Sequence, residues 1–120
     1  MTDPGTKNRA IHRRARYSLR GLGEGWRRER SIRDCLIGCL VGIAALALAS
    51  PAPIWWGLCL FAGAMSLALE YVNAALESLL DRLHPEMHPA IGAAKDMASS
   101  AALVLNIAAI GIVALAVTQG

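Results

Sequence analysis

The sequence predicts an all-α membrane protein, with an N-terminal amphipathic surface helix followed by three transmembrane helices. Two observations lead to this fold class: long runs of uncharged residues, and basic residues concentrated before the first run. Of the 120 residues, 55% are hydrophobic and only 5% aromatic, a composition that suits one small helical domain. We therefore expect residues 1–120 to form a single membrane domain.

The basic N-terminal segment, 1–30, predicts a short tail and then a helix lying in the membrane surface. On a helical wheel, one side is apolar and consists of Ile11, Ala15, Leu19, Leu22 and Trp26. The opposite side is basic and consists of Arg9, Arg13, Arg16, Arg20 and Arg27. Such a helix directs arginines toward lipid phosphates and apolar side chains toward acyl chains. The alternative is an unordered basic flank, and the glycines at 21, 23 and 25 predict a bend toward the first span.

The first uncharged run is too long for one span. It extends over 35 residues from Cys35 to Leu69, whereas about 20 residues cross the hydrocarbon core. The sequence SPAP at 50–53 interrupts it, and prolines so close together do not fit inside a helix. We expect span one over 32–50, a tight hairpin, and span two over 54–81.

The second uncharged run, from Met97 to Gly120, predicts span three over 97–118 and a loop over 82–96. Ten of the 12 Lys and Arg residues precede Cys35, and the hairpin has none. Because basic flanks stay on the cytoplasmic side, the N-terminus and the loop are predicted inside and the C-terminus outside. Polar residues of span three, namely Ser99, Ser100 and Asn106, are expected to hydrogen-bond to neighbouring helices.

One face of span two carries oxygen-bearing side chains. Glu70, Asn73, Glu77 and Asp81 follow one another at helical spacing and therefore project from one side. Carboxylates this close resist joint ionisation unless a cation or a proton compensates, and Mg²⁺ prefers hard oxygen ligands. An acid within a span is functional by default, although Glu77 and Asp81 also fit a solvated helix end.

The position of Glu70 near the cytoplasmic edge suggests where chemistry occurs. Acids and basic residues on that side fit a metal-bound anionic substrate that meets a lipid, as in nucleotide-dependent phosphoryl transfer. No G-x-x-x-x-G-K-[ST], Gly-rich kinase loop or H-R-D motif is present, so a kinase would need an unusual nucleotide site. A small proton-coupled transporter is the alternative; its carboxylate would lie near the midplane, usually among four spans. A scaffold would not require the aligned polar face.

The segment EYVNAALESLLD at 70–81 resembles the signature of the prokaryotic diacylglycerol kinases, small three-span lipid kinases that include undecaprenol kinases. That signature is approximately E-x-[aliphatic]-N-[ST]-[AS]-[aliphatic]-E-x-x-[IV]-D. HPEMHPAIGAAKDMAS at 84–99 is similar to the family's cytoplasmic loop, and YSLRGLGEGWRRE at 17–29 to its surface helix. Ala74 stands where Ser or Thr is usual, and Asp34 lies one residue before a carboxylate of some members.

The resemblance implies a homotrimer of the bacterial inner membrane whose sites are shared between subunits. It implies ATP-dependent phosphorylation of the hydroxyl of diacylglycerol, which gives phosphatidic acid at the cytoplasmic face. Undecaprenol is the alternative acceptor within the family. The expected cofactor is Mg²⁺, the expected partners are ATP, the lipid and the membrane, and no nucleic acid is expected.

The resemblance also implies roles for individual residues. Glu70 would be the catalytic base that takes the proton from the lipid hydroxyl, and Asn73 would hold the reacting groups. Glu29 and Glu77 would bind Mg²⁺, and Ser99 would lie close to the lipid. The implied nucleotide-binding residues are Tyr17, Glu86, His88, Lys95 and Asp96.

Some of these residues have a structural alternative. His84 and His88 are four residues apart but flanked by prolines, so they lack the helix that a zinc pair of the H-E-x-x-H type needs. Lys95 and Asp96 fit equally well as residues that cap and anchor span three.

Overall fold

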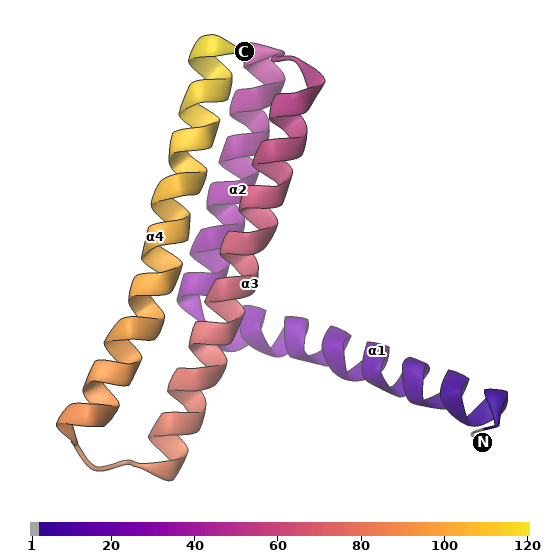
Figure 1. Cartoon of the computed structure of the whole chain (residues 1–120), viewed down its shortest axis with the longest axis vertical. Helices are drawn as coiled ribbons and strands as arrows, with labels where there is room; N and C mark the ends of the chain where they lie inside the picture. Colours follow the sequence, from indigo (N-terminus) through magenta and orange to yellow (C-terminus); the bar gives the residue numbers. More distant parts are fainter. Residues whose placement is uncertain (1–2) are drawn as a thin grey trace.

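The computed structural model of the chain describes residues 3–120 and consists of four helices. They are α1 (Pro4–Arg28), α2 (Arg30–Ala49), α3 (Pro53–Leu83) and α4 (Pro89–Gln119). Helices α2, α3 and α4 form an elongated bundle, from which α1 projects sideways (Figure 1). These three helices are long and apolar enough to cross a membrane, and residues 3–120 contain no strand. The all-α prediction with three candidate spans is confirmed.

Helix α1 differs from the sequence prediction at both ends. The expected polar tail is helical from Pro4, because the Asp3 side chain accepts a hydrogen bond from the Gly5 amide and proline is favoured in the first turn. The three glycines do not bend the helix, which continues to Arg28. The chain turns at Glu29 instead, whose extended backbone ends α1 and precedes α2.

The hairpin between α2 and α3 follows from the prolines. Ser50 ends α2 in the left-handed conformation, and its amide donates to the Leu46 carbonyl at 2.8 Å. Pro53 is the first residue of α3, a position where its missing amide hydrogen is not needed. The break expected within 50–53 is therefore present, and α2 begins two residues earlier than the expected span one.

The connection between α3 and α4 is much shorter than the predicted loop over 82–96. Helix α3 continues to Leu83 and α4 already begins at Pro89, so Lys95 and Asp96 lie on α4. The reason is local: Nδ1 of His88 accepts a hydrogen bond from the Ala90 amide at 3.1 Å and caps the helix. The alanines that follow are strong helix formers.

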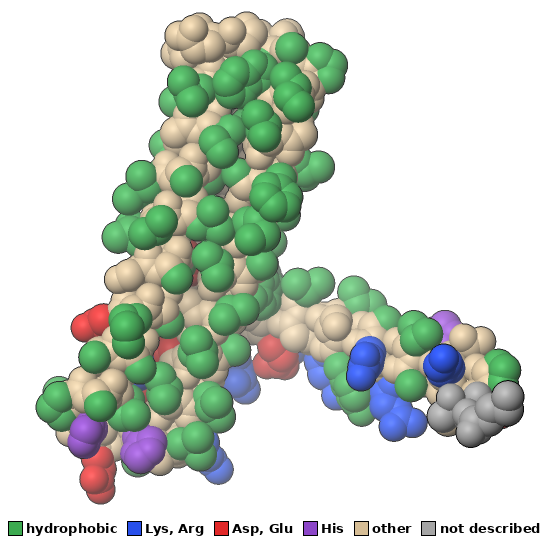
Figure 2. Space-filling model, in the orientation of Figure 1, with side chains coloured by type: hydrophobic (Ala, Val, Ile, Leu, Met, Phe, Trp, Pro, Cys, Tyr) green, Lys and Arg blue, Asp and Glu red, His purple; other side chains and the backbone are tan. Residues whose placement is uncertain are grey.

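The bundle has few buried side chains, as expected for helices that face lipid. Its buried apolar residues are mostly small and comprise Ile32, Leu46, Ala62, Ala102 and Ala116. Large hydrophobic side chains cover the outside of the spans, whereas charged side chains gather on α1 and around the α3–α4 loop (Figure 2). The α2–α3 hairpin and the C-terminus lie at the opposite end (Figure 1).

Helices α3 and α4 extend beyond the level at which α1 leaves the bundle (Figure 1). Each contains 31 residues, or roughly 46 Å at the helical rise per residue. A hydrocarbon core is about 30 Å thick. The loop-proximal ends of these two helices are therefore long enough to stand in water.

Candidate active site at the buried carboxylate

Glu70, on α3, is a buried carboxylate in an otherwise largely apolar bundle. Its residue surface is only 8% exposed. Nδ2 of Asn106, on α4, donates a hydrogen bond to Glu70 Oε1 at 3.0 Å. A buried carboxylate without a partner is strongly disfavoured, so this amide satisfies a group that the apolar helices cannot. The cross-helix hydrogen bond expected of Asn106 is confirmed, and its partner is the carboxylate itself.

The neighbouring Tyr71 fixes the height of Glu70 along the bundle. The Tyr71 hydroxyl donates to the Leu22 carbonyl of α1 at 2.6 Å. The tyrosine ring packs directly on Gly25, where an added Cβ would clash with the ring and would lie 2.8 Å from Cδ1 of Ile32. Only glycine permits this close approach of α1. Glu70 therefore lies at the level where α1 leaves the bundle.

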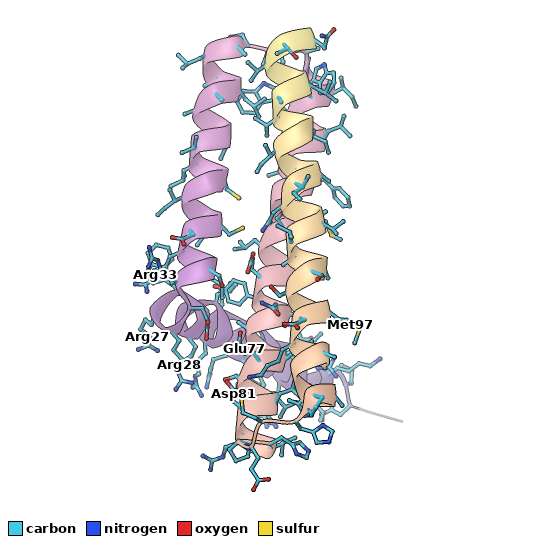
Figure 3. The ribbon with its side chains drawn as sticks, turned by 90° about the vertical axis from the view of Figure 1, so that its left-hand side faces the viewer. Arg27, Arg28, Arg33, Glu77, Asp81 and Met97 are labelled. Carbon is cyan, nitrogen blue, oxygen red and sulfur yellow. The ribbon has the colours of Figure 1, made fainter. Side chains whose placement is uncertain are left out.

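The polar face of α3 changes from buried to exposed toward the loop. Glu70 is buried, Asn73 is half-buried, and Glu77 and Asp81 are exposed. All four belong to one uninterrupted helix, so the shared face inferred from their spacing holds. Figure 3 shows Glu77 and Asp81 on the part of α3 nearer the loop. Asp81 forms an ion pair with Lys95 of α4.

Glu29 and Glu77 are chemically suited to a magnesium ion that arrives with phosphate groups. Within residues 3–120, neither side chain takes part in a hydrogen bond or an ion pair, whereas Glu24 pairs with Arg27 at 2.6 Å and Arg28 at 3.1 Å. The described residues contain no group of three or more His, Cys, Asp or Glu side chains able to hold a metal. Mg²⁺ typically takes one or two carboxylates and completes its shell with phosphates and waters.

The expected nucleotide residues lie in three separate places. Glu86, His88 and Lys95 line a hollow at the α3–α4 loop, together with Asp81 and neighbouring loop residues. Asp96 is exposed on α4 and does not line it. Tyr17 is 57% exposed on α1, with the Arg20 guanidinium 6.0 Å from its ring centre. No hydrogen bond or ion pair among the described residues connects Tyr17 to the hollow, or Glu29 to Glu77.

A shallow, open apolar groove runs along α4 and is bordered by one residue of α3, the one before Glu70; Glu70 itself does not line it. It is lined by Leu69, Met97, Ser100, Ala101, Val104, Leu105 and Ala108. Ser100 contributes to the lining and Ser99 does not. The Ser100 hydroxyl donates to the Asp96 carbonyl of its own helix at 2.8 Å, so the cross-helix bond expected of Ser100 does not form within residues 3–120. Apart from the Ser100 side chain, the lining residues are apolar.

Sequence reasoning missed three residues around Glu70. Tyr71 and Gly25 join α3 to α1, and a tyrosine next to the acid gave no sign of that partner. Ser66, one turn before Glu70, is 3% exposed, and its hydroxyl has no partner within residues 3–120. Its position four residues before Glu70, on the same helical face, was the available signal.

These features define a small membrane protein of three candidate spans in which residues 3–120 contain one buried carboxylate, at the level where α1 joins the bundle. The prokaryotic diacylglycerol kinase family matches residues 16–117. The chain is 34% identical over 88 residues to a diacylglycerol kinase of Helicobacter pylori J99, which covers 73% of this chain and 69% of the relative. It is 30% identical over 100 residues to the diacylglycerol kinase of Escherichia coli K12, with 83% and 82% covered. The chain belongs to the prokaryotic diacylglycerol kinase family.

Proposed function

We propose that this protein is an ATP-dependent diacylglycerol kinase that converts diacylglycerol into phosphatidic acid. Its relatives from Helicobacter pylori and Escherichia coli carry the name diacylglycerol kinase. The observation that carries the proposal is the burial of Glu70 at the level where α1 leaves the bundle. If α1 lies in the membrane surface, the headgroup of a lipid, and not its tail, would meet the carboxylate at this level.

Glu70 is the proposed general base. It takes the proton of the lipid hydroxyl while the oxygen attacks the γ-phosphorus of ATP and the bond to the β-phosphate oxygen breaks, which releases ADP. This chemistry needs a positioned hydroxyl, a proton acceptor and compensation of the phosphate charge. Asn73, less than one turn away on the same face, is the proposed residue that holds the reacting groups.

The negative charge of the ATP phosphates would be compensated near the exposed end of the polar face of α3. Glu29 and Glu77 are the proposed magnesium ligands, and bound Mg²⁺ would neutralise phosphate oxygens. Lys95 would exchange Asp81 for a phosphate oxygen when ATP enters the loop hollow. Glu86, His88 and Asp96 are the proposed contacts to the sugar and base, and Ser99 is proposed to lie near the lipid.

We propose that the loop, α1 and the active site face the cytoplasm of a bacterial inner membrane, where ATP is present. Figure 3 shows Arg27 and Arg28 at about the height of Glu77 along the bundle, and basic flanks favour the inside. In this arrangement α1 lies in the membrane surface with its arginines toward lipid phosphates. The α2–α3 hairpin and Gly120 lie outside.

We also propose a homotrimer in which neighbouring subunits complete each site. Tyr17 and Glu29 are the reason for this proposal. Within the described residues, no hydrogen bond or ion pair joins Tyr17 to the loop hollow or Glu29 to Glu77. A neighbouring copy could supply them. A proton-coupled transporter is disfavoured, because Glu70 lies at the level of α1, the proposed surface helix, and not at the proposed bilayer midplane.

The test is phosphoryl transfer by the purified protein in detergent micelles, with ATP labelled at the γ-phosphate. We expect label in phosphatidic acid when diacylglycerol and Mg²⁺ are both present, and none when either is omitted. Parallel micelles with undecaprenol test the alternative acceptor. Preferred labelling of undecaprenol would replace the substrate but keep the kinase, whereas no labelled lipid in either series would overturn the proposed function.

A further inference from the structure

We propose that Asn106 is a positioning residue that orients Glu70 for proton abstraction. Its amide holds Oε1 against α4 and leaves Oε2 as the oxygen that meets the lipid hydroxyl. The inference rests on the proposed role of Glu70 as the base. Asn106 comes from α4, so a second helix would fix the carboxylate that α3 carries.

The hydrogen bond limits an otherwise mobile side chain. A glutamate has three rotatable side-chain bonds, and ordering such a chain costs entropy that a specific partner must offset. The Asn106 amide is the only hydrogen-bond or ion-pair partner of the Glu70 side chain within residues 3–120. Because a small misplacement of a reacting group greatly slows an enzyme, fixing one oxygen would matter for rate.

The chemical nature of the partner also fits a base. An amide N–H satisfies one carboxylate oxygen without carrying a positive charge. A lysine or arginine in its place would form an ion pair and hold the carboxylate more strongly against protonation. Asn106 therefore supplies orientation while leaving Glu70 able to accept the proton.

Holding α3 and α4 together does not require this contact. These two helices form the most extensive helix–helix contact of the bundle, and each carries a buried small residue, Ala62 on α3 and Ala102 on α4. Close packing of small residues is itself a main source of helix association in membranes. Loss of the amide should therefore be felt at Glu70 more than in the assembly of the bundle.

The test compares Asn106→Leu with Asn106→Gln in the full chain, assayed in diacylglycerol micelles. We expect Asn106→Leu to lower kcat on the order of 10- to 100-fold with an unchanged KM for ATP. Asn106→Gln, which keeps an amide donor, should recover most of that loss. Thr118→Val is the matched control, because the Thr118 hydroxyl donates only to the Ala114 carbonyl of its own helix; it should behave as wild type.

A second readout does not depend on activity. A membrane-soluble carbodiimide attaches to carboxyl groups in apolar surroundings, and the modified Glu70 peptide can be quantified by mass spectrometry, with Glu70→Gln as the blank. In the Asn106→Leu variant, we expect the Glu70 carboxyl group to react several-fold faster than in wild type, because no amide holds it. In the Asn106→Gln variant, it should react at nearly the wild-type rate.

The outcomes separate the two proposals. Wild-type kcat and wild-type labelling in Asn106→Leu would overturn the positioning role. So would equal losses in Asn106→Leu and Asn106→Gln accompanied by the same fall in melting temperature, because that result means a purely structural contact. Normal turnover in Glu70→Gln would instead overturn Glu70 as the base, while the labelling rates would still report whether Asn106 holds it.

Discussion

Two acids on the same face of α3 have opposite surroundings. Glu70 is 8% exposed and receives a neutral amide from Asn106, whereas the Asp81 side chain is 58% exposed and receives the ammonium group of Lys95. Both partners come from α4. The difference shows that α4 supplies charge only where water surrounds the pair, and supplies an uncharged donor where the carboxylate is buried.

This difference has a consequence for chemistry. An ion pair would hold Glu70 in its charged form, and a carboxylate that must accept a proton is better served by a partner without charge. At the exposed end, the positive charge of Lys95 can instead change partners, because water screens its attraction to Asp81. Under the proposed function, the buried end of the face would serve proton transfer and the exposed end phosphate binding.

The largest expected effect is at the buried acid. Glu70→Gln keeps the shape of the side chain and can still bond to Asn106, but it removes the base. We expect turnover to fall by about 10² to 10⁴, measured as labelled phosphatidic acid, while circular dichroism and elution from a sizing column match wild type. Near-normal turnover would break the comparison, because Glu70 would then be a structural acid.

An effect of intermediate size is expected at the proposed magnesium ligands, Glu29 and Glu77. Glu29→Gln and Glu77→Gln should each shift the magnesium dependence of activity to higher concentration and be partly rescued by added Mg²⁺. Mutation of residues that only hydrogen-bond to metal ligands often lowers metal affinity by roughly 10- to 100-fold. Loss of a direct ligand should therefore lower the affinity for Mg²⁺ at least about tenfold.

Glu24→Gln is the matched control for these variants. Glu24 lies five residues before Glu29 but is already paired with Arg27 and Arg28. Its magnesium titration should superimpose on that of wild type. If the Glu29→Gln and Glu77→Gln titrations also superimpose on it, the metal assignment fails.

The fold was largely predictable because its signals are local. Uncharged runs gave the spans, the prolines at 51 and 53 gave the hairpin, and residue spacing gave the polar face of α3. The start of α4 at Pro89 was missed because the following uncharged run begins only at Met97, and the side-chain cap by His88 was not recognised. Counting apolar residues finds the membrane segment but not the helix that continues beyond it.

The centre of the candidate site was only partly predictable. Glu70 stood out because a carboxylate in an apolar run needs an explanation, but its partner lies 36 residues away, and that of Tyr71 lies 49 residues away. Such pairs depend on how each helix is rotated in the bundle, which a single sequence does not specify. The roles given to Tyr17 and Glu29 stay predictions, because one chain does not bring them to the other site residues.

The smallest expected effect is at the exposed ion pair. Asp81→Asn removes the negative charge that pairs with Lys95 when no ATP is bound. Exposed ion pairs contribute little to the stability of the fold. If Lys95 exchanges Asp81 for a phosphate oxygen, then losing the competitor should lower the KM for ATP, by roughly two- to fivefold given the weakness of such pairs. The melting temperature and kcat should hardly change.

Ionic strength and a second variant make this prediction sharp. Lys95→Met should raise the KM for ATP, because the phosphate loses its cation, so the two variants of one ion pair should move the same constant in opposite directions. Added salt screens exposed charges, and the difference between Asp81→Asn and wild type should therefore shrink as salt is raised. A fall in kcat for Asp81→Asn comparable with that of Glu70→Gln would mean that the exposed acid takes part in proton transfer, and the division of α3 into a base at its buried end and a phosphate site at its exposed end would be wrong.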